Sequence, residues 1–211
     1  MARKTKEEAL ETRNAILDAT VRVFAAKGAA NVSLADIARE AGVTRGAIYW
    51  HFANKADLLN ALWNEVLLIY TPLARASESR DEPDPLGRLK ELYVRFLGRL
   101  ADDPRQQQLI RILFDQKSGG EDLDLIRTRH LETLHERNRS VQTVLRNGID
   151  RGQLPADLDV RLGTIAVVSF MHGLIANWVL TPDLFDIKRD APALIDGLLQ
   201  MLKSGLGRTP P

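Results

Sequence analysis

A cluster of polar and aromatic side chains between Ser33 and Lys55 carries the clearest chemical signal in this sequence. The planar guanidinium of Arg45 matches the O6/N7 edge of guanine, and neighbouring hydroxyl, indole, imidazole and ammonium groups offer further contacts to a DNA duplex. Gly46 has no side chain to hold the backbone away from the duplex. The predicted DNA-binding residues are Ser33, Thr44, Arg45, Gly46, Tyr49, Trp50, His51 and Lys55.

Two short helices must position these side chains. Ser33 is a good N-cap, and an apolar stripe at i, i+3, i+4 and i+7 follows it, up to Gly42, where a left-handed C-cap needs a residue without a Cβ. The stripe consists of Leu34, Ile37, Ala38 and Ala41. Thr44 caps a second helix of residues 45–52, whose inward residues are Ala47, Ile48 and Phe52. This spacing predicts a helix-turn-helix with an exposed recognition helix.

Each of these residues also has a purely structural interpretation. Tyr49 and Trp50 could pack against the flank of a helix, and Lys55 could be an ordinary solvated lysine of a first helical turn. Ser33 fits a cap better than a DNA contact, and His51 fits a structural role as well as a phosphate contact. The complete segment, with its caps, glycine and spacing in register, favours DNA binding.

At this point the residues resemble a known family. The segment TRGAIYWHFANKADL resembles the recognition-helix signature of TetR/AcrR-type bacterial regulators, in particular the multidrug-efflux repressors among them. The opening MARKTKEEALETRNAILDA is similar to the first helix of that group, and DPLGRL, RGQLPADLD and HGLIANWVL extend the resemblance further along the chain. The resemblance implies a homodimer and phosphate contacts by Tyr49, His51 and Lys55.

The rest of the chain is helical by pattern, which predicts an all-α, TetR-like fold of about nine helices. Helices are expected near residues 10–27, 34–41, 45–52, 55–69, 86–101, 109–114, 122–150, 160–180 and 191–203. The first helix should carry an apolar stripe of Leu10, Leu17, Val21 and Phe24, and Asn54 should cap the fourth helix. Pro72 should bend or interrupt that helix, and 77–85 should be a polar connection. We predict a three-helix DNA-binding head at residues 1–53 and a ligand-binding and dimerisation body at 54–211.

Composition and charge fit a soluble regulator. The 211 residues are 45% hydrophobic and 27% charged, and the absence of cysteine excludes disulfides and thiolate metal sites. Residues 1–55 carry nine Lys/Arg and six Asp/Glu, a net +3, so with a total of +1 the remaining residues carry −2. The longest apolar run, 165–180, is shorter than a membrane span of about 20 residues, and we expect it to be a buried helix. We expect a cytoplasmic protein without a membrane segment.

Other functional classes lack their signatures. The sequence contains no Gly-rich phosphate loop, G-x-S-x-G elbow or cysteine nucleophile, so we expect no enzyme and no cofactor. His130 and His135 are five residues apart, on different faces of one helix, so no metal site is predicted. A purely structural helical protein would not expose the face that carries Arg45, Tyr49 and Trp50.

The last two predicted helices supply a candidate dimer surface. Their apolar residues are Leu162, Ile165, Phe170, Leu174, Trp178, Leu194, Leu198, Met201 and Leu202. These residues are more apolar than the exterior of a monomer should be, although the alternative is that they pack the core of the monomer itself. A dimer would place two recognition helices on a palindromic operator.

Resemblance to the efflux repressors also implies a large pocket for a small hydrophobic effector. The residues at matching helix positions are Val66, Leu89, Leu92, Phe96, Ile110, Phe114, Leu134, Arg137, Asn138, Val141, Val168, Met171, His172 and Ile175. Any apolar residue among them could instead be plain core. The stretch 115–121, DQKSGGE, departs from the His-Lys-Cys-Glu of many relatives, which puts a borrowed ligand identity in doubt.

The functional prediction is therefore a ligand-responsive transcriptional repressor of a multidrug efflux operon. An effector among the central helices would shift the fourth helix, change the spacing of the two heads and release the operator. The alternative is a TetR-like regulator of another target, in metabolism, signalling or cell division. This alternative stays open because the residues of the DNA-binding head indicate DNA binding but do not indicate which gene is regulated.

Overall fold

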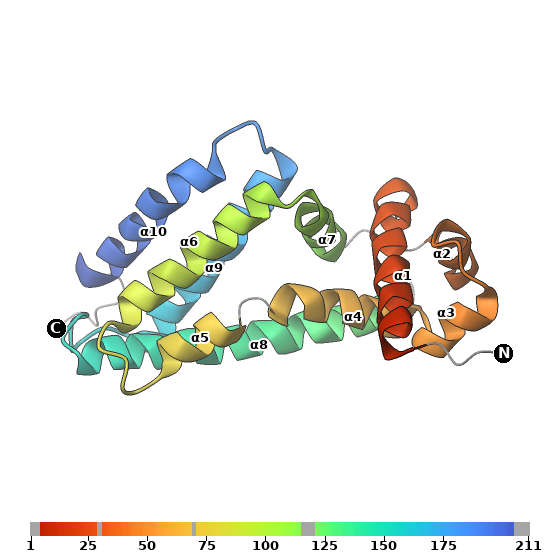
Figure 1. The fold of residues 1–211 in the computed structure, drawn as a ribbon. Helices are drawn as coiled ribbons and strands as arrows, with labels where there is room; N and C mark the ends of the chain where they lie inside the picture. Colours follow the sequence, from red (N-terminus) through yellow and green to blue (C-terminus); the bar gives the residue numbers. More distant parts are fainter. Residues whose placement is uncertain (1–4, 29–30, 69–70, 115–120, 205–211) are drawn as a thin grey trace. The chain divides into compact units, whose positions relative to one another are not determined.

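The computed structural model describes residues 5–28, 31–68, 71–114 and 121–204, and within them all regular structure is helical (Figure 1). The side chains of 66–68, 72–73, 113–114, 121–127 and 129–130 lie outside this description. The helices are α1 Lys6–Lys27, α2 Leu34–Glu40, α3 Arg45–His51, α4 Lys55–Leu68, α5 Thr71–Glu78, α6 Pro85–Asp102, α7 Pro104–Phe114, α8 Glu121–Asp150, α9 Val160–Leu180 and α10 Ile187–Ser204. The all-α prediction is confirmed, and the described residues hold ten helices where about nine were expected.

The chain forms two compact units. Unit 1 comprises residues 1–66 and 105–130, and unit 2 comprises 67–104 and 131–211. Unit 1 therefore contains α1 to α3, most of α4 and α7, and the beginning of α8. The functional division between residues 53 and 54 stays a prediction.

The caps predicted for the first helices are present. The Ser33 hydroxyl accepts a hydrogen bond from the Asp36 backbone N–H at 3.2 Å, and the Asp36 carboxylate accepts one from the Ser33 N–H at 3.1 Å, which together form a capping box. Gly28 and Gly42 follow α1 and α2 with φ of 75° and 66°, values that favour glycine. These local interactions fix where each helix begins and ends.

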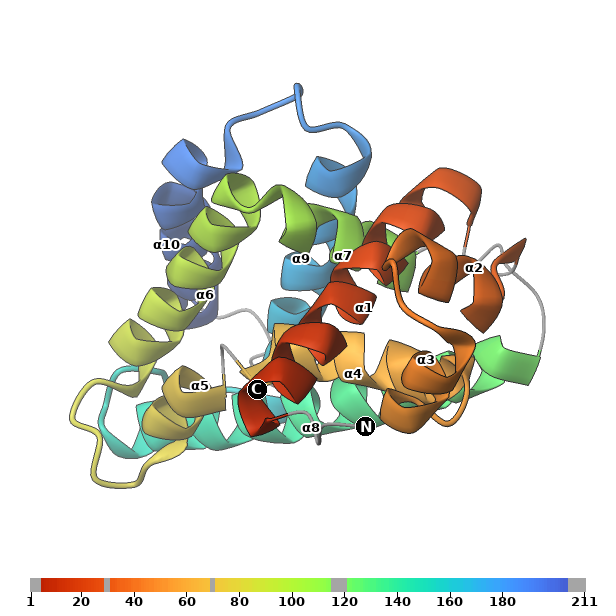
Figure 2. The ribbon, with the colours of Figure 1, turned by 45° about the vertical axis from the view of Figure 1, so that its right-hand side comes forward.

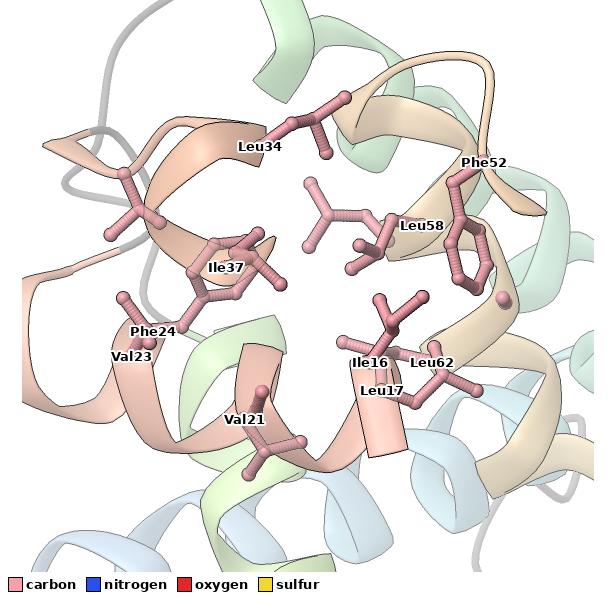
Figure 3. Packing of buried hydrophobic residues seen from close by; sticks show 14 of the residues in the cluster. Ile16, Leu17, Val21, Val23, Phe24, Leu34, Ile37, Phe52, Leu58 and Leu62 are labelled. Carbon is pink, nitrogen blue, oxygen red and sulfur yellow. The ribbon is translucent and has the colours of Figure 1, made fainter. Parts of the chain in front are cut away.

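One apolar core holds unit 1 together (Figure 3). Its labelled side chains come from α1, α2 and α4 and from Phe52, directly after α3, and they include Ile16 and Leu17 of α1, Ile37 of α2 and Leu58 of α4. Leu10 was expected on this stripe but is 57% exposed, because the buried residues of α1 begin only at Ile16. The apolar core of unit 1 therefore packs against the second half of α1.

An ion-pair bridge adds a polar tie within unit 1. The Arg105 guanidinium, in the first turn of α7, donates to Asp18 of α1 and to Glu65 of α4, both at 2.7 Å. Because both carboxylates and the guanidinium are only partly exposed, these hydrogen bonds hold three helices of the unit in register.

Unit 2 is built around α6 and α10, which lie side by side in both ribbon views (Figures 1 and 2). Lys90 of α6 donates to Asp196 of α10 at 2.7 Å, and Lys188 of α10 donates to Asp102 of α6 at 2.6 Å. The apolar interior includes Leu97, Leu145, Val167, Ile195 and Leu202, which come from α6, α8, α9 and α10. The two ion pairs thus connect α6 and α10 at two different points along the helices.

The predicted interruption of the fourth helix near Pro72 is confirmed: α4 ends at Leu68, and Pro72 occupies the second position of a separate helix α5, where its missing N–H leaves no helical hydrogen bond unmade. Other boundaries differ from the prediction, since α1 begins at Lys6 and α7 at Pro104, where residues 10 and 109 were expected. Ser77, expected in the polar connection, is buried in α5 and donates to the Ala74 carbonyl at 2.7 Å. The last helix starts at Ile187 rather than 191, because the Asp186 carboxylate accepts from the Arg189 N–H at 3.0 Å and caps it.

The apolar helix α9 is the one described helix long and apolar enough to span a membrane by length and composition. Eight of its residues are buried in the structure, as expected for a core helix of a globular unit: Gly163, Thr164, Val167, Val168, Met171, Ile175, Trp178 and Val179. The predicted buried run 165–180 is wrong at its ends, since Ile165 and Leu180 are exposed.

Candidate DNA-binding surface and ligand site

The inner face of α3 is anchored in the core of unit 1. Ile48 and Phe52 are almost completely buried, and the Thr44 hydroxyl accepts a hydrogen bond from the Ala47 N–H at 3.1 Å. Ala47, expected to point inward, is half-buried. A helix of only seven residues is thus fixed by one cap and two apolar side chains. Its remaining side chains are available for binding.

The outer face of α3 exposes two large aromatic rings. Tyr49 is 58% exposed and Trp50 is 74% exposed, and Thr44, Arg45 and Gly46 are exposed beside them. Exposed rings of this size are unusual on a surface that faces only water. We call this set (Thr44, Arg45, Gly46, Tyr49 and Trp50) the recognition surface.

His51 and Lys55 are less accessible than predicted. His51 is half-buried, because it ends α3 next to the buried Phe52, and its ring meets Trp50 edge-on with centroids 4.5 Å apart. Lys55 is half-buried in the first turn of α4. This turn is capped as predicted, since the Asn54 side-chain oxygen accepts from the Asp57 N–H at 2.8 Å. Phosphate contacts by either residue stay predictions.

Ser33 and Arg45 differ in how their polar groups are used. The Asp36 carboxylate accepts hydrogen bonds from the Ser33 hydroxyl at 2.6 Å and from the Ser33 backbone N–H at 3.1 Å, and these two bonds hold the pKa of Asp36 below its ordinary value. Ser33 therefore acts as a cap.

Arg45 makes no hydrogen bond or ion pair to another residue of the described chain, so its guanidinium is free to bind an external acceptor.

The predicted pocket residues divide between the two units. Val66, Ile110 and Phe114 belong to unit 1, where Ile110 is buried and the side chains of the other two lie outside the described residues. The rest belong to unit 2: Leu89, Leu92, Phe96, Leu134, Arg137, Asn138, Val141, Val168, Met171, His172 and Ile175. The divergent stretch 115–120 also lies outside the description. Unit 2 thus holds the larger part of the predicted site.

Most of this unit 2 set is buried apolar surface, with three polar side chains among it. The apolar members are buried except Phe96 and Leu134, which are half-buried. Asn138 donates from its side-chain amide to the Leu134 carbonyl of its own helix at 2.8 Å. Arg137 and His172 are half-buried. An apolar lining with few polar groups is typical of small-molecule sites.

A third residue, Tyr93 of α6, joins Arg137 of α8 and His172 of α9 electrostatically. Burial raises the pKa of the Tyr93 phenol well above its ordinary value, although the positive charge of Arg137 opposes that rise. Burial lowers the pKa of Arg137, and burial together with the charge of Arg137 lowers the pKa of His172. We call these three residues the polar cluster. Sequence reasoning counted Tyr93 only as core; a phenol hydroxyl within an apolar stripe was the available signal.

The candidate dimer surface is only partly exposed. Leu162, Ile165 and Met201 are exposed. Three other predicted members, Phe170, Leu174 and Leu194, are half-buried. The last three, Trp178, Leu198 and Leu202, are buried within unit 2 and form its core instead of a surface. The monomer therefore accounts for part of this apolar character, and an apolar stripe on α9 and α10 remains uncovered.

Comparisons with known proteins cover nearly the whole chain. A family model described as bacterial regulatory proteins, tetR family, matches residues 16–62, and one described as MAATS-type transcriptional repressor, C-terminal region, matches residues 84–204. The chain is 42% identical over 203 residues to the probable HTH-type transcriptional regulator ArpR of Pseudomonas putida, which covers 96% of this chain and 97% of that protein.

Two solved structures share the fold over the same length. NalD, the secondary repressor of the MexAB-OprM multidrug efflux pump in Pseudomonas aeruginosa, is 31% identical with a TM-score of 0.83, covering 94% of this chain and 98% of that chain. SmeT, the repressor of the Stenotrophomonas maltophilia multidrug efflux pump SmeDEF, in its complex with triclosan, is 26% identical with a TM-score of 0.81, covering 93% of this chain and 94% of that chain.

Proposed function

Because this chain belongs to the TetR family of bacterial regulatory proteins, we propose that it is a repressor of a multidrug efflux operon, released from its operator by a small hydrophobic effector. The family consists of transcriptional regulators that bind operator DNA as dimers and respond to small molecules. The operon and the release mechanism are our proposals. The family, which the segment TRGAIYWHFANKADL indicated, and the all-α fold, which the helical pattern of the chain predicted, are confirmed.

The recognition surface is the observation that carries the DNA-binding part of the proposal. Its inner anchors, Ile48 and Phe52, are buried, so α3 presents a fixed face, with Arg45 unengaged and Trp50 74% exposed. A recognition helix reads base edges with its N-terminal residues. Arg45, at the first position of α3, is therefore assigned to base contacts, and Tyr49, Trp50, His51 and Lys55 to the flanking backbone.

A dimer supplies the affinity that one short helix lacks. Two copies related by a twofold axis would place their recognition helices about 34–36 Å apart, in successive major grooves of a palindromic site. The exposed Leu162 and Ile165 of α9 and Met201 of α10 give an apolar stripe for such contact. We assign the dimer interface to this stripe, with the half-buried Phe170, Leu174 and Leu194 at its border.

We assign the effector site to unit 2 and propose that a bound effector weakens DNA binding by shifting α4. Helix α4 runs from unit 1 into unit 2, because the boundary between the units falls after Val66 and the helix ends at Leu68. A ligand that binds the DNA-incompetent spacing tighter by about 1–3 kcal/mol weakens operator binding roughly 5- to 150-fold. The similarity to NalD and SmeT, which are repressors of multidrug efflux pumps, supports the proposed efflux target. We place the protein in the cytoplasm, where its operator lies.

Footprinting of the DNA that flanks the gene, with the purified full chain, tests this proposal. A protected palindrome next to an efflux operon, and its release by triclosan in a gel shift, are the expected results. Triclosan is chosen because it is the ligand of the similar SmeT complex. Protection of a site with no pump gene beside it would refute the efflux assignment, and no protected site at all would refute DNA binding there.

A further inference from the structure

Unit 2 contains a positive charge that nothing in the described chain neutralises. Arg137 is half-buried on α8, and among the described residues its guanidinium has no hydrogen bond and no ion pair. The side chains that act on it electrostatically are Tyr93 and His172, neither of which carries a negative charge at neutral pH. Within the part of the chain that the structure describes, the cation therefore has no anionic partner.

Each helix that contributes to the polar cluster carries apolar residues one turn to either side, next to polar ones such as Ser140 of α8, which donates to the Glu78 carboxylate, and Lys90 of α6, which pairs with Asp196. One turn to either side of Arg137 on α8 are Leu134 and Val141, and the corresponding neighbours of Tyr93 on α6 are Leu89 and Phe96. Residues three or four apart share a helix face. His172 on α9 lies likewise between Val168 and Ile175, both buried. The charge thus sits in a predominantly apolar part of unit 2.

The carboxylates of α6, α8 and α9 whose side chains the structure describes are ion-paired or exposed. Glu91 of α6 accepts from Arg88 at 2.9 Å and from Arg95 at 2.7 Å. Glu136, adjacent to Arg137 in the sequence, is exposed, and α9 contains neither Asp nor Glu. A cation removed from water without a partner is costly, so buried charges in proteins are normally paired or bind a ligand. No residue that the structure describes supplies this partner, so we look for it in a bound ligand.

We infer that the effector is an amphiphilic anion, whose ionised carboxylate or similar acid group pairs with Arg137 while its apolar body contacts the residues around the polar cluster. This inference rests on the proposed function, since it concerns the same effector site. The Tyr93 hydroxyl and the His172 imidazole supply hydrogen bonds to the acid group. Neutral molecules of equal shape bind less tightly, and cations are repelled by Arg137.

A matched pair of probes tests the charge requirement directly. 2-Naphthoate and 2-naphthamide have nearly the same shape, but only the first is anionic. Calorimetric titration of the full chain without DNA is expected to give a dissociation constant for naphthoate about 10- to 100-fold lower than for naphthamide, the range for a hydrogen-bonded pair of charges. Direct titration is independent of operator release, so its result and the footprinting result can fail separately.

Two variants locate the preference. Arg137→Met removes the charge and keeps the length of the side chain, and Arg139→Met makes the same change two residues along α8 at an exposed position. The acid preference should disappear in Arg137→Met and persist in Arg139→Met, with both variants folded by circular dichroism. Arg137→Lys, which keeps a charge, should retain part of the preference and shows whether loss in Arg137→Met reflects charge or packing.

Equal binding of both naphthyl probes by the parent protein, binding of neither probe at millimolar concentration, or an acid preference that survives in Arg137→Met would each overturn the inference. Naphthoate binding through Arg137 without operator release would leave the anion site intact and refute the release mechanism. Operator release by neutral drugs, with no acid preference in titration, would support the release mechanism and refute the anion site.

Discussion

Arg45→Ala tests the reading of DNA by α3. Arg45 is exposed at the first position of the helix and makes no hydrogen bond or ion pair within the described chain, so its removal takes away no stabilising interaction. The cap is unaffected, because Thr44 accepts from the backbone of Ala47. The free energy of unfolding should change by less than about 0.5 kcal/mol.

The effect on DNA affinity follows from the geometry of the interaction. A bidentate pair of hydrogen bonds to guanine contributes about 1–3 kcal/mol of base discrimination. A symmetric dimer makes this interaction twice, so the variant should bind more weakly by about 2–6 kcal/mol if the half-sites act independently. The lower end corresponds to a roughly 30-fold higher dissociation constant. Two symmetric positions of the operator should lose their preference for guanine.

Fluorescence anisotropy at one fixed salt concentration measures both effects, on the footprinted operator and on a panel with single base-pair substitutions. Arg111→Ala is the control, since it removes the same charge from an exposed position of α7 in unit 1. Lys55→Ala should instead weaken binding to all sequences and lower the salt slope by about 1 for each phosphate that is no longer neutralised. An Arg45→Ala variant that kept the affinity and base preferences of the parent would refute the assignment of α3 to the major groove.

Three further perturbations test the fold, the pH response and the assembly. Ile48→Ala empties a fully buried position under α3 and should cost about 2–5 kcal/mol in urea unfolding; a cost below about 1 kcal/mol would mean that α3 is not anchored there. Asp84 has a lowered pKa, chiefly because the Gln153 amide donates to it at 2.6 Å. The ionised Asp84 carboxylate therefore stabilises the fold above its unfolded pKa of about 3.9, and this stabilisation is lost as the pH falls through its lower folded pKa. The urea midpoint of Asp84→Asn should depend less on acidic pH than that of the parent protein. Identical plots of urea midpoint against pH for the two proteins would contradict this. Leu162→Glu with Ile165→Glu should convert the dimer to a folded monomer in light scattering, and an unchanged mass would exclude this stripe of α9 as the interface.

The local part of this molecule could be predicted from the sequence. The caps at Ser33, Thr44 and Asn54 and the glycine at position 42 are present where the residue types indicated them. Each depends on interactions between residues at most four apart, so the chain carries the whole signal locally. For the same reason the described helices other than α5 were expected in the right order, and the motif that ends at Lys55 identified the family.

Tertiary structure decided which faces are covered and which charges are paired. Periodicity shows that a helix has an apolar face, but Leu10 became exposed and Trp178 became buried according to what packs against each of them. Likewise, nothing in the neighbouring residues reveals that Tyr93, Arg137 and His172, from three different helices, act on one another. Helix formation depends on near neighbours along the chain, whereas burial and charge pairing depend on segments brought together only by folding.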